Sequence, residues 1–130
     1  MRDRMETELR LLRQRYAEVE ATDAYDWIRI FPVRTGDGWS SDPVAVAFQV
    51  PAGFPATPPY GFFVPAGLTF RGTQPGSFQP RPSIQPPFPR PWAMFSWQHD
   101  GGWRPTGDLV TGSNLLNWTR TFALRFAEGI

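Results

Sequence analysis

Residues 48–65 read FQVPAGFPATPPYGFFVP, which places a short Pro-rich turn between two apolar segments. The segment before the turn, residues 43–50, alternates between larger and smaller side chains, as expected for a strand whose side chains point to opposite faces in turn. It predicts a half-buried antiparallel strand. One face carries Val44, Val46, Phe48 and Val50, and the other carries Ala45, Ala47 and Gln49. Residues 60–64, after the turn, predict the next strand.

Two further elements precede this pair of strands. Residues 25–34 are rich in β-branched and aromatic side chains and predict a strand, and residues 35–38 (TGDG) predict the hairpin turn after it. Residues 2–16 predict a helix, because apolar side chains recur at steps of four, three and four and form one stripe. The stripe consists of Met5, Leu9, Leu12 and Tyr16.

The C-terminal part of the chain predicts a long loop and a last helix. Residues 71–91 are rich in Pro and lack periodicity, which favours a loop. This loop either covers the domain as a stiff segment or, through the Pro-x-x-Pro pattern of residues 86–89, docks into an aromatic groove of a partner. Residues 114–127 predict a helix with Ser113 as its N-cap and Gly129 as its stop.

The order of these elements predicts one domain over residues 1–130 of the α+β class. We expect an N-terminal helix, an antiparallel β-meander of three to four strands, a long Pro-rich loop and a C-terminal helix. The formal net charge is +1 with no basic stripe, which argues against nucleic acid as a partner. No apolar run approaches the roughly 18 residues of a membrane span, and the charged N-terminus lacks an apolar signal core. We therefore expect a cytoplasmic protein without a membrane partner.

The composition also excludes several kinds of chemistry. The chain has no cysteine, so it offers no disulfide, zinc-thiolate site, iron–sulfur cluster or thiol nucleophile. All 13 basic residues are arginine, so the chain has no lysine amine. The sequence contains no phosphate-binding glycine loop and no cluster of metal ligands, and we expect no cofactor.

The Pro-rich turn and the segment before the last helix resemble the ubiquitin-conjugating enzymes. In that family a strand ends in Tyr/Phe-Pro, followed by two or three residues, Pro-Pro and another strand, and a Trp-x-Pro element precedes a helix. The chain is most similar to the bacterial members called prokaryotic family E, and the resemblance implies a single ubiquitin-conjugating-enzyme-like domain. The matching positions are Phe54, Pro55, Pro58, Pro59, Trp103 and Pro105.

The resemblance implies two partners, a ubiquitin-like protein and an activating-enzyme-like protein, beside which the bacterial members are usually encoded. The position of the family's catalytic cysteine holds Ser96, within the apolar residues 92–97. The family's His-Pro-Asn element, whose Asn stabilises the oxyanion, is absent from the sequence. Thioester transfer is therefore impossible, and a ubiquitin-like C-terminus passed to Ser96 would form an oxyester.

The residues after Ser96 suggest how an oxyester would form. A serine hydroxyl is a poor nucleophile unless a base lies within hydrogen-bond reach. His99, the only histidine, is the candidate base, and Asp100 or Asp108 is the candidate carboxylate that orients it. Backbone N–H groups around residues 101–102 are candidates to replace the missing Asn.

Two other interpretations remain open at this point. In the first, Ser96 only fills the former cysteine site, and the domain is a catalytically inactive conjugating-enzyme variant that acts as a binding scaffold for the ubiquitin-like protein or the activating enzyme. In the second, the chain is a Pro-rich adaptor with no relation to conjugation. The sequence does not identify the conjugation target or the linkage.

Overall fold

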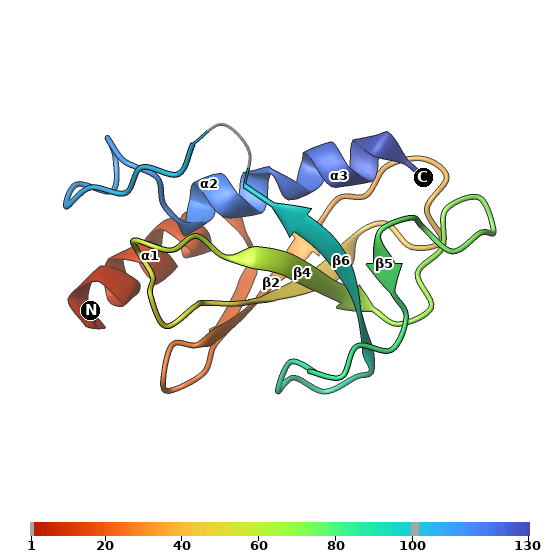
Figure 1. Cartoon of the computed structure of the whole chain (residues 1–130), viewed down its shortest axis with the longest axis horizontal. Coiled ribbons are helices and arrows are strands. Elements are labelled where there is room, and N and C mark those ends of the chain that lie inside the picture. Colours follow the sequence, from red (N-terminus) through yellow and green to blue (C-terminus); the bar gives the residue numbers. More distant parts are fainter. Residues whose placement is uncertain (1, 100–101) are drawn as a thin grey trace.

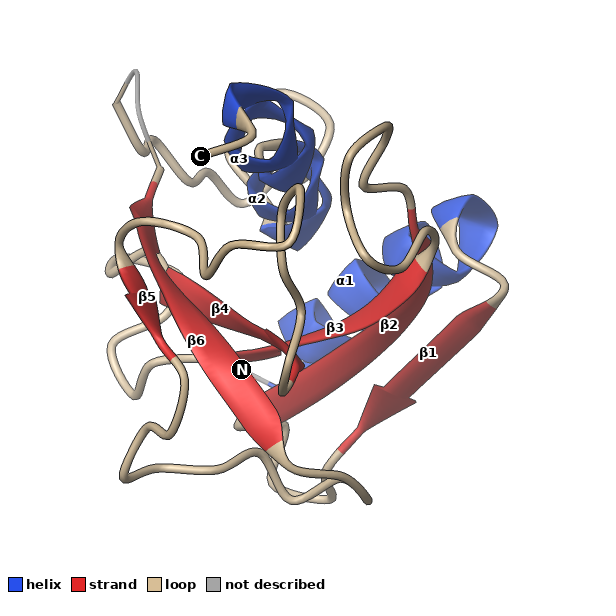
Figure 2. Ribbon diagram, turned by 90° about the vertical axis from the view of Figure 1, so that its right-hand side faces the viewer, coloured by secondary structure: helices blue, strands red, loops and turns tan. Residues whose placement is uncertain are grey.

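The computed structural model describes residues 2–99 and 102–130 and has the α+β class that the sequence predicts. Helix α1 is followed by six strands in one sheet of order β1-β2-β3-β4-β6-β5, and helices α2 and α3 end the chain. All paired neighbours in the sheet are antiparallel. Figures 1 and 2 show α2 and α3 in line along one side of the sheet. The elements are α1 (Arg2–Arg15), β1 (Glu18–Ala21), β2 (Trp27–Val33), β3 (Val44–Gln49), β4 (Tyr60–Pro65), β5 (Phe78–Gln79), β6 (Trp92–Gln98), α2 (Leu115–Arg120) and α3 (Phe122–Glu128).

The main core lies between the helices and the sheet, where the apolar stripe of residues 2–16 meets one face of the alternating residues 43–50. The apolar stripe of α1 is buried, and the predicted core face of β3 belongs to the same cluster. The Phe48 ring of β3 meets the rings of Trp118 and Phe122 at centroid distances of 6.5 Å and 6.2 Å. The predicted division of β3 into two faces is therefore confirmed, and the face with the larger side chains meets the helices.

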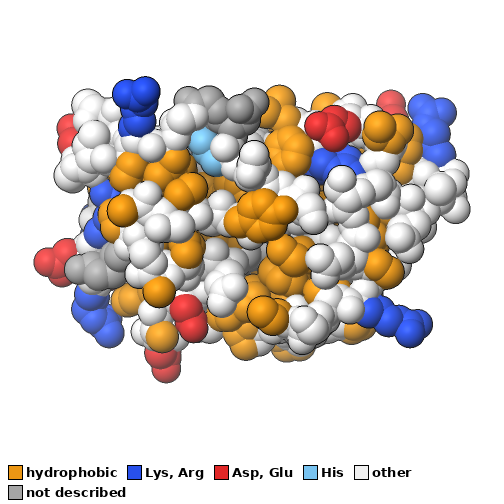
Figure 3. Space-filling view, in the orientation of Figure 1, with side chains coloured by type: hydrophobic (Ala, Val, Ile, Leu, Met, Phe, Trp, Pro, Cys, Tyr) orange, Lys and Arg blue, Asp and Glu red, His pale blue; other side chains and the backbone are white. Residues whose placement is uncertain are grey.

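The expectation that β3 is only half-buried is wrong, because a second apolar cluster covers the other face. Ala45 and Ala47 are buried there with large aromatic side chains, whereas Gln49 is exposed as expected. The Pro-rich segment explains this cover, since Phe88 packs against the cluster and its carbonyl oxygen accepts a hydrogen bond from Trp92 Nε1 at 3.1 Å. Figure 3 shows hydrophobic side chains across the middle of the face on which β4 and β6 lie. The second cluster contains Trp27, Ala45, Ala47, Phe63 and Trp92.

The long Pro-rich loop acts as a covering segment in this structure. Pro82 and Pro86 are buried, so the Pro-x-x-Pro pattern of residues 86–89 does not present both prolines to a partner. Gln85 ties the segment to the sheet, because its side chain accepts a hydrogen bond from Trp92 N and donates one to Trp92 O, both at 2.9 Å.

The sheet has six strands, so the expected three to four strands were too few. Strand β1 has only four residues and carries two glutamates, and β5 has only two residues within the Pro-rich segment. Strand β6 reads WAMFSWQ without a period of two, because clusters on both faces of the sheet bury its apolar side chains. Strand β1 alternates polar and apolar residues, but only over its four positions, whereas β5 and β6 lack the alternation that identifies a half-buried strand.

The C-terminal helix is present but divided, and its N-cap differs from the prediction. Asn114, not Ser113, caps α2 in a reciprocal capping box with Asn117. The Ser113 hydroxyl instead accepts a hydrogen bond from Arg104 N at 2.9 Å. The predicted stop is confirmed, since Gly129 adopts a left-handed conformation with φ of 71° at the end of α3.

Candidate functional site

Ser96 lies near the end of β6 in a local irregularity of the sheet. The register of β6 against β4 shifts by one residue there, so that Ser96 and Trp97 together oppose the single Gly61. Gly61 has a φ of +72°, and a Cβ atom built on it would collide with the side chain of Met94. Bulges of this kind bend a strand and re-aim its side chains, and they occur often beside active sites.

Ser96 is half-buried and lines a shallow hollow of about 510 Å³ at the end of β6. Its backbone N–H donates to Ser77 O at 2.8 Å, which anchors the bulge beside β5. Glu128 of α3 is the only charged side chain among the described residues that line the hollow. Arg125 Nη1 lies 3.9 Å from Glu128 Oε1 and attracts this carboxylate. The described lining residues are Tyr60, Ser96, Trp97, Gln98 and Glu128.

His99 is not among the described residues that line the hollow of Ser96. Its ring meets the Trp103 ring edge-on at a centroid distance of 5.2 Å, and its Nδ1 is buried without a hydrogen-bond partner among the described residues. Trp103 in turn donates from Nε1 to Pro55 O at 2.6 Å. The structure therefore places His99 against the Trp-x-Pro element. The candidate partners Asp100 and Gly101 lie outside the described residues.

The two halves of the sequence motif come together in space. Trp103 packs against Phe54 at a ring distance of 6.2 Å and bonds to Pro55, although about fifty positions separate them. Phe54 and Pro59 are buried, and Pro58 and Pro105 are half-buried. The motif residues therefore join the Pro-rich turn to the segment that leads into α2.

A buried ion pair holds α1 against the same segment, and sequence reasoning missed it. Glu8 is fully buried, accepts a hydrogen bond from Leu115 N at 2.9 Å, and is 3.2 Å from Arg4 Nε. Burial raises the pKa of the Glu8 carboxyl above its usual value, although these two contacts oppose the shift. The sequence does indicate that Glu8 faces the core, since it falls three residues after Met5 and four before Leu12, on the apolar stripe of α1.

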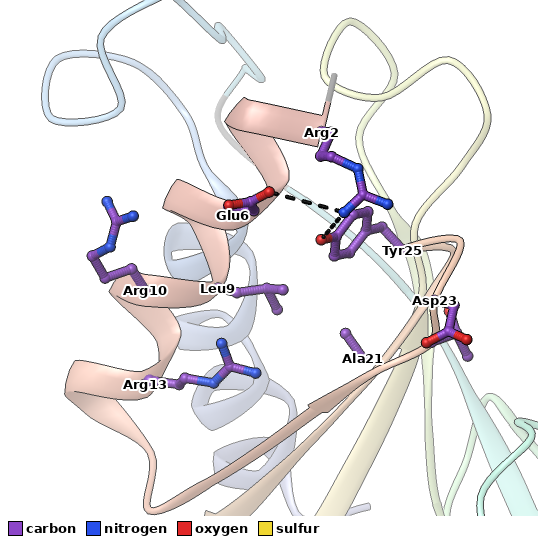
Figure 4. Close-up of a pocket in the computed structure, with 9 residues that line it drawn as sticks. Arg2, Glu6, Leu9, Arg10, Arg13, Ala21, Asp23 and Tyr25 are labelled. Atoms are coloured by element: carbon purple, nitrogen blue, oxygen red, sulfur yellow. Dashed lines mark hydrogen bonds and ion pairs between the residues drawn. The ribbon is translucent and has the colours of Figure 1, made fainter.

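A polar cleft of about 750 Å³ separates the other flank of α1 from the turn between β1 and β2. Figure 4 shows Arg2 beside Tyr25, whose hydroxyl accepts a hydrogen bond from Arg2 Nη1 at 3.0 Å. Arg13 points from α1 into the gap, whereas Arg10 points outward. Three arginines and two carboxylates line the cleft, which leaves it one positive charge. Its charged lining residues are Arg2, Glu6, Arg10, Arg13 and Asp23.

Comparisons of this chain with protein-family models, with curated proteins and with solved structures found no match. No helix in the described part of the chain is long and apolar enough to cross a membrane. Within residues 2–99 and 102–130, no group of three or more His, Asp or Glu side chains is arranged to hold a metal ion.

Proposed function

We propose that this chain is a ubiquitin-conjugating-like component of a bacterial ubiquitin-like modification pathway, and that Ser96 receives the C-terminus of a ubiquitin-like protein as an oxyester. The observation that carries the proposal is the position of Ser96 in a bulge that lines an open hollow. The contact between Trp103 and the Phe54-Pro55 turn adds support, because it joins the two motifs on which the resemblance rests.

Glu128 is the group in this hollow that fits the role of base. The Ser96 hydroxyl oxygen attacks the carbonyl carbon of the activated C-terminus, its proton passes to the Glu128 carboxylate, and the activating group leaves with the electron pair of the broken bond. No hydrogen bond joins Ser96 Oγ to the Glu128 carboxylate in the described structure, so the two side chains must approach each other when the substrate binds. A carboxylate within hydrogen-bond reach then accelerates such a step by about 100-fold or more. In this proposal His99 supports the Trp103 segment and does not act on Ser96.

The cleft beside α1 is the surface that we assign to the activating enzyme. Arg10 and Arg13 are exposed and make no ion pair among the described residues, so they are available to acidic groups of a partner. Arginine forks bind carboxylates in pairs of parallel hydrogen bonds, which gives orientation as well as affinity.

The scaffold interpretation is the second candidate, and the position of His99 favours it. The imidazole lies against Trp103 and outside the lining of the hollow, so the serine–histidine pair expected from the sequence is not assembled in the described structure. In this alternative the domain binds the ubiquitin-like protein or the activating enzyme without forming a covalent bond to either.

Intact-mass measurement under denaturing conditions tests the proposal. The protein is incubated with ATP, with a bacterial ubiquitin-like protein and with the activating enzyme of that protein. We expect an adduct that survives thiol reductant and is lost in mild alkali or hydroxylamine, as an ester is. Ser96→Ala should abolish the adduct, and the control Ser83→Ala, at an exposed position of the Pro-rich segment, should retain it.

The same assay assigns the base. Glu128→Gln should slow adduct formation roughly 100-fold, and His99→Ala should leave the rate within a few-fold of the wild type. An adduct that persists in Ser96→Ala contradicts the proposal. No adduct in any variant, together with binding of the two partners, supports the scaffold instead.

A further inference from the structure

The segment between Arg104 and Ser113 forms a closed loop that projects beside α1. Its two ends are joined by a pair of hydrogen bonds, from Ser113 N to Arg104 O and from Arg104 N to Ser113 Oγ, both at 2.9 Å. Figure 1 shows this loop at the left end of the molecule, above α1. Compact surface loops whose ends lie close together are often functional.

Hydrogen bonds within the loop fix its shape before any partner arrives. Asp108 is the centre of this network: its side chain accepts from Val110 N at 2.9 Å, and its carbonyl oxygen accepts from Thr106 Oγ1 at 2.6 Å and Gly112 N at 3.1 Å. The loop is also anchored to α1, since Arg4 Nη1 donates to Thr106 O at 2.6 Å. A loop held in one conformation loses little conformational entropy on binding.

This ordered loop presents an apolar residue to solvent. Val110 is 88% exposed, more than any other large hydrophobic side chain in the described part of the chain. With Leu109 and with Leu11 of α1 it lines a hollow of about 510 Å³ in which exposed apolar surface exceeds polar surface. An apolar patch with a polar rim is typical of a protein-binding surface.

The charges around the patch indicate the chemistry of its partner. The carboxylates of Asp3 and Asp108 border it and are exposed, whereas the guanidinium of Arg4 is already engaged with Glu8 and with two carbonyl groups. The flank of α1 that faces this loop is thus apolar and acidic, in contrast to the cleft lined by Arg10 and Arg13 on its other flank.

We infer that Leu11, Leu109 and Val110 form a docking surface for a protein segment that presents an apolar side chain between basic residues. Burial of Val110 and the neighbouring leucines supplies the hydrophobic contact. Basic groups of the partner face Asp3 and Asp108 at the rim, where they favour the correct partner over an acidic one. This docking surface on the loop and α1 does not depend on whether Ser96 carries an acyl group.

Methyl NMR of the whole chain tests this inference with two synthetic peptides. The first has a central Leu-Phe pair flanked by two arginines on each side, and the second has glutamates in place of the arginines. We expect the basic peptide to shift the methyl signals of Leu11, Leu109 and Val110, and the acidic peptide to leave them unchanged. Val110→Ser should weaken binding of the basic peptide at least about fivefold without changing the melting temperature.

Leu124→Ser is the matched control, because Leu124 is 61% exposed on α3 and lies outside the patch. It should bind the basic peptide as the wild type does. The inference is overturned if the basic peptide shifts no methyl signal of the patch at millimolar concentration, if both peptides shift these signals equally, or if Val110→Ser binds as tightly as the wild type.

Discussion

Replacing Glu8 by Ala tests the buried contact between α1 and the start of α2. The substitution leaves the N–H group of Leu115 buried without its acceptor, which costs about 1–3 kcal/mol. Arg4 loses its carboxylate partner but keeps hydrogen bonds to Thr106 O and Ser113 O. We therefore place the loss at about 3 kcal/mol, the lower end of the range for breaking a buried ion pair. This is a large part of the roughly 5–15 kcal/mol that stabilises a domain.

Urea unfolding measures this loss, and Glu8→Gln separates the charge from the hydrogen bond. The amide oxygen of Gln still accepts from Leu115 N, so this variant should lose less stability than Glu8→Ala. An Ala variant that loses less than about 1 kcal/mol would contradict the assignment of Glu8 as a buried acceptor.

The pH dependence of stability in the wild type and in Glu8→Gln checks the direction of the Glu8 pKa shift. Burial raises the pKa of Glu8 in the folded state, so its contribution to stability is fully present below its ordinary pKa of 4.5. That contribution is lost as the pH rises through the raised value. The stability of the wild type relative to Glu8→Gln should therefore fall as the pH rises above the ordinary pKa of 4.5. A wild type that gains on the Gln variant over this range would refute the direction of the shift.

Three further predictions concern the sheet and the cleft beside α1. Val46→Asp should prevent folding, because an unpaired buried carboxylate costs several kcal/mol, and a cooperative thermal transition by circular dichroism would contradict this. Gly61→Ala should destabilise the domain by about 1–2 kcal/mol because of its positive φ, and the contact of the new Cβ atom with Met94 should add to this loss. A urea unfolding curve that matches that of the wild type would argue against the bulge geometry. Arg10→Glu combined with Arg13→Glu should weaken binding to the activating enzyme in a salt-dependent way, with little change in melting temperature. A pull-down of the activating enzyme that is unaltered by the two substitutions would exclude the cleft as the docking surface of that enzyme.

Periodicity in the sequence predicted most of the elements that bury a regular apolar face. Helix α1 follows from apolar side chains at steps of three and four, and strand β3 follows from the alternation of its side chains at steps of two. Strand β6 could not be identified in this way, since both of its faces are covered. The short strands β1 and β5 depend on pairing with neighbours that only the folded chain provides.

The candidate site was predictable only in part, because it combines residues from distant parts of the chain. The resemblance named Ser96 and Trp103 as candidates without placing them in the fold, and the structure puts Ser96 near the end of β6 and Trp103 against the Pro-rich turn. It gave no sign of Glu128, which reaches the hollow from α3 after 31 intervening residues. Proximity in sequence favoured His99 as the partner of Ser96, yet the imidazole lies against Trp103 and is not among the described residues that line the hollow.

Ser96→Cys tests most directly whether the side chain at position 96 carries the ubiquitin-like C-terminus. A thiolate is the better nucleophile near neutral pH, so this variant should form an adduct at least as fast as the wild type. Intact mass with and without thiol reductant is measured for both proteins, and peptide mapping locates the modified residue. We expect the wild-type adduct to resist reductant and the Ser96→Cys adduct to be released by it, both at position 96. An adduct with the same resistance to reductant in both proteins, or one mapped to the N-terminal amine, would contradict the claim.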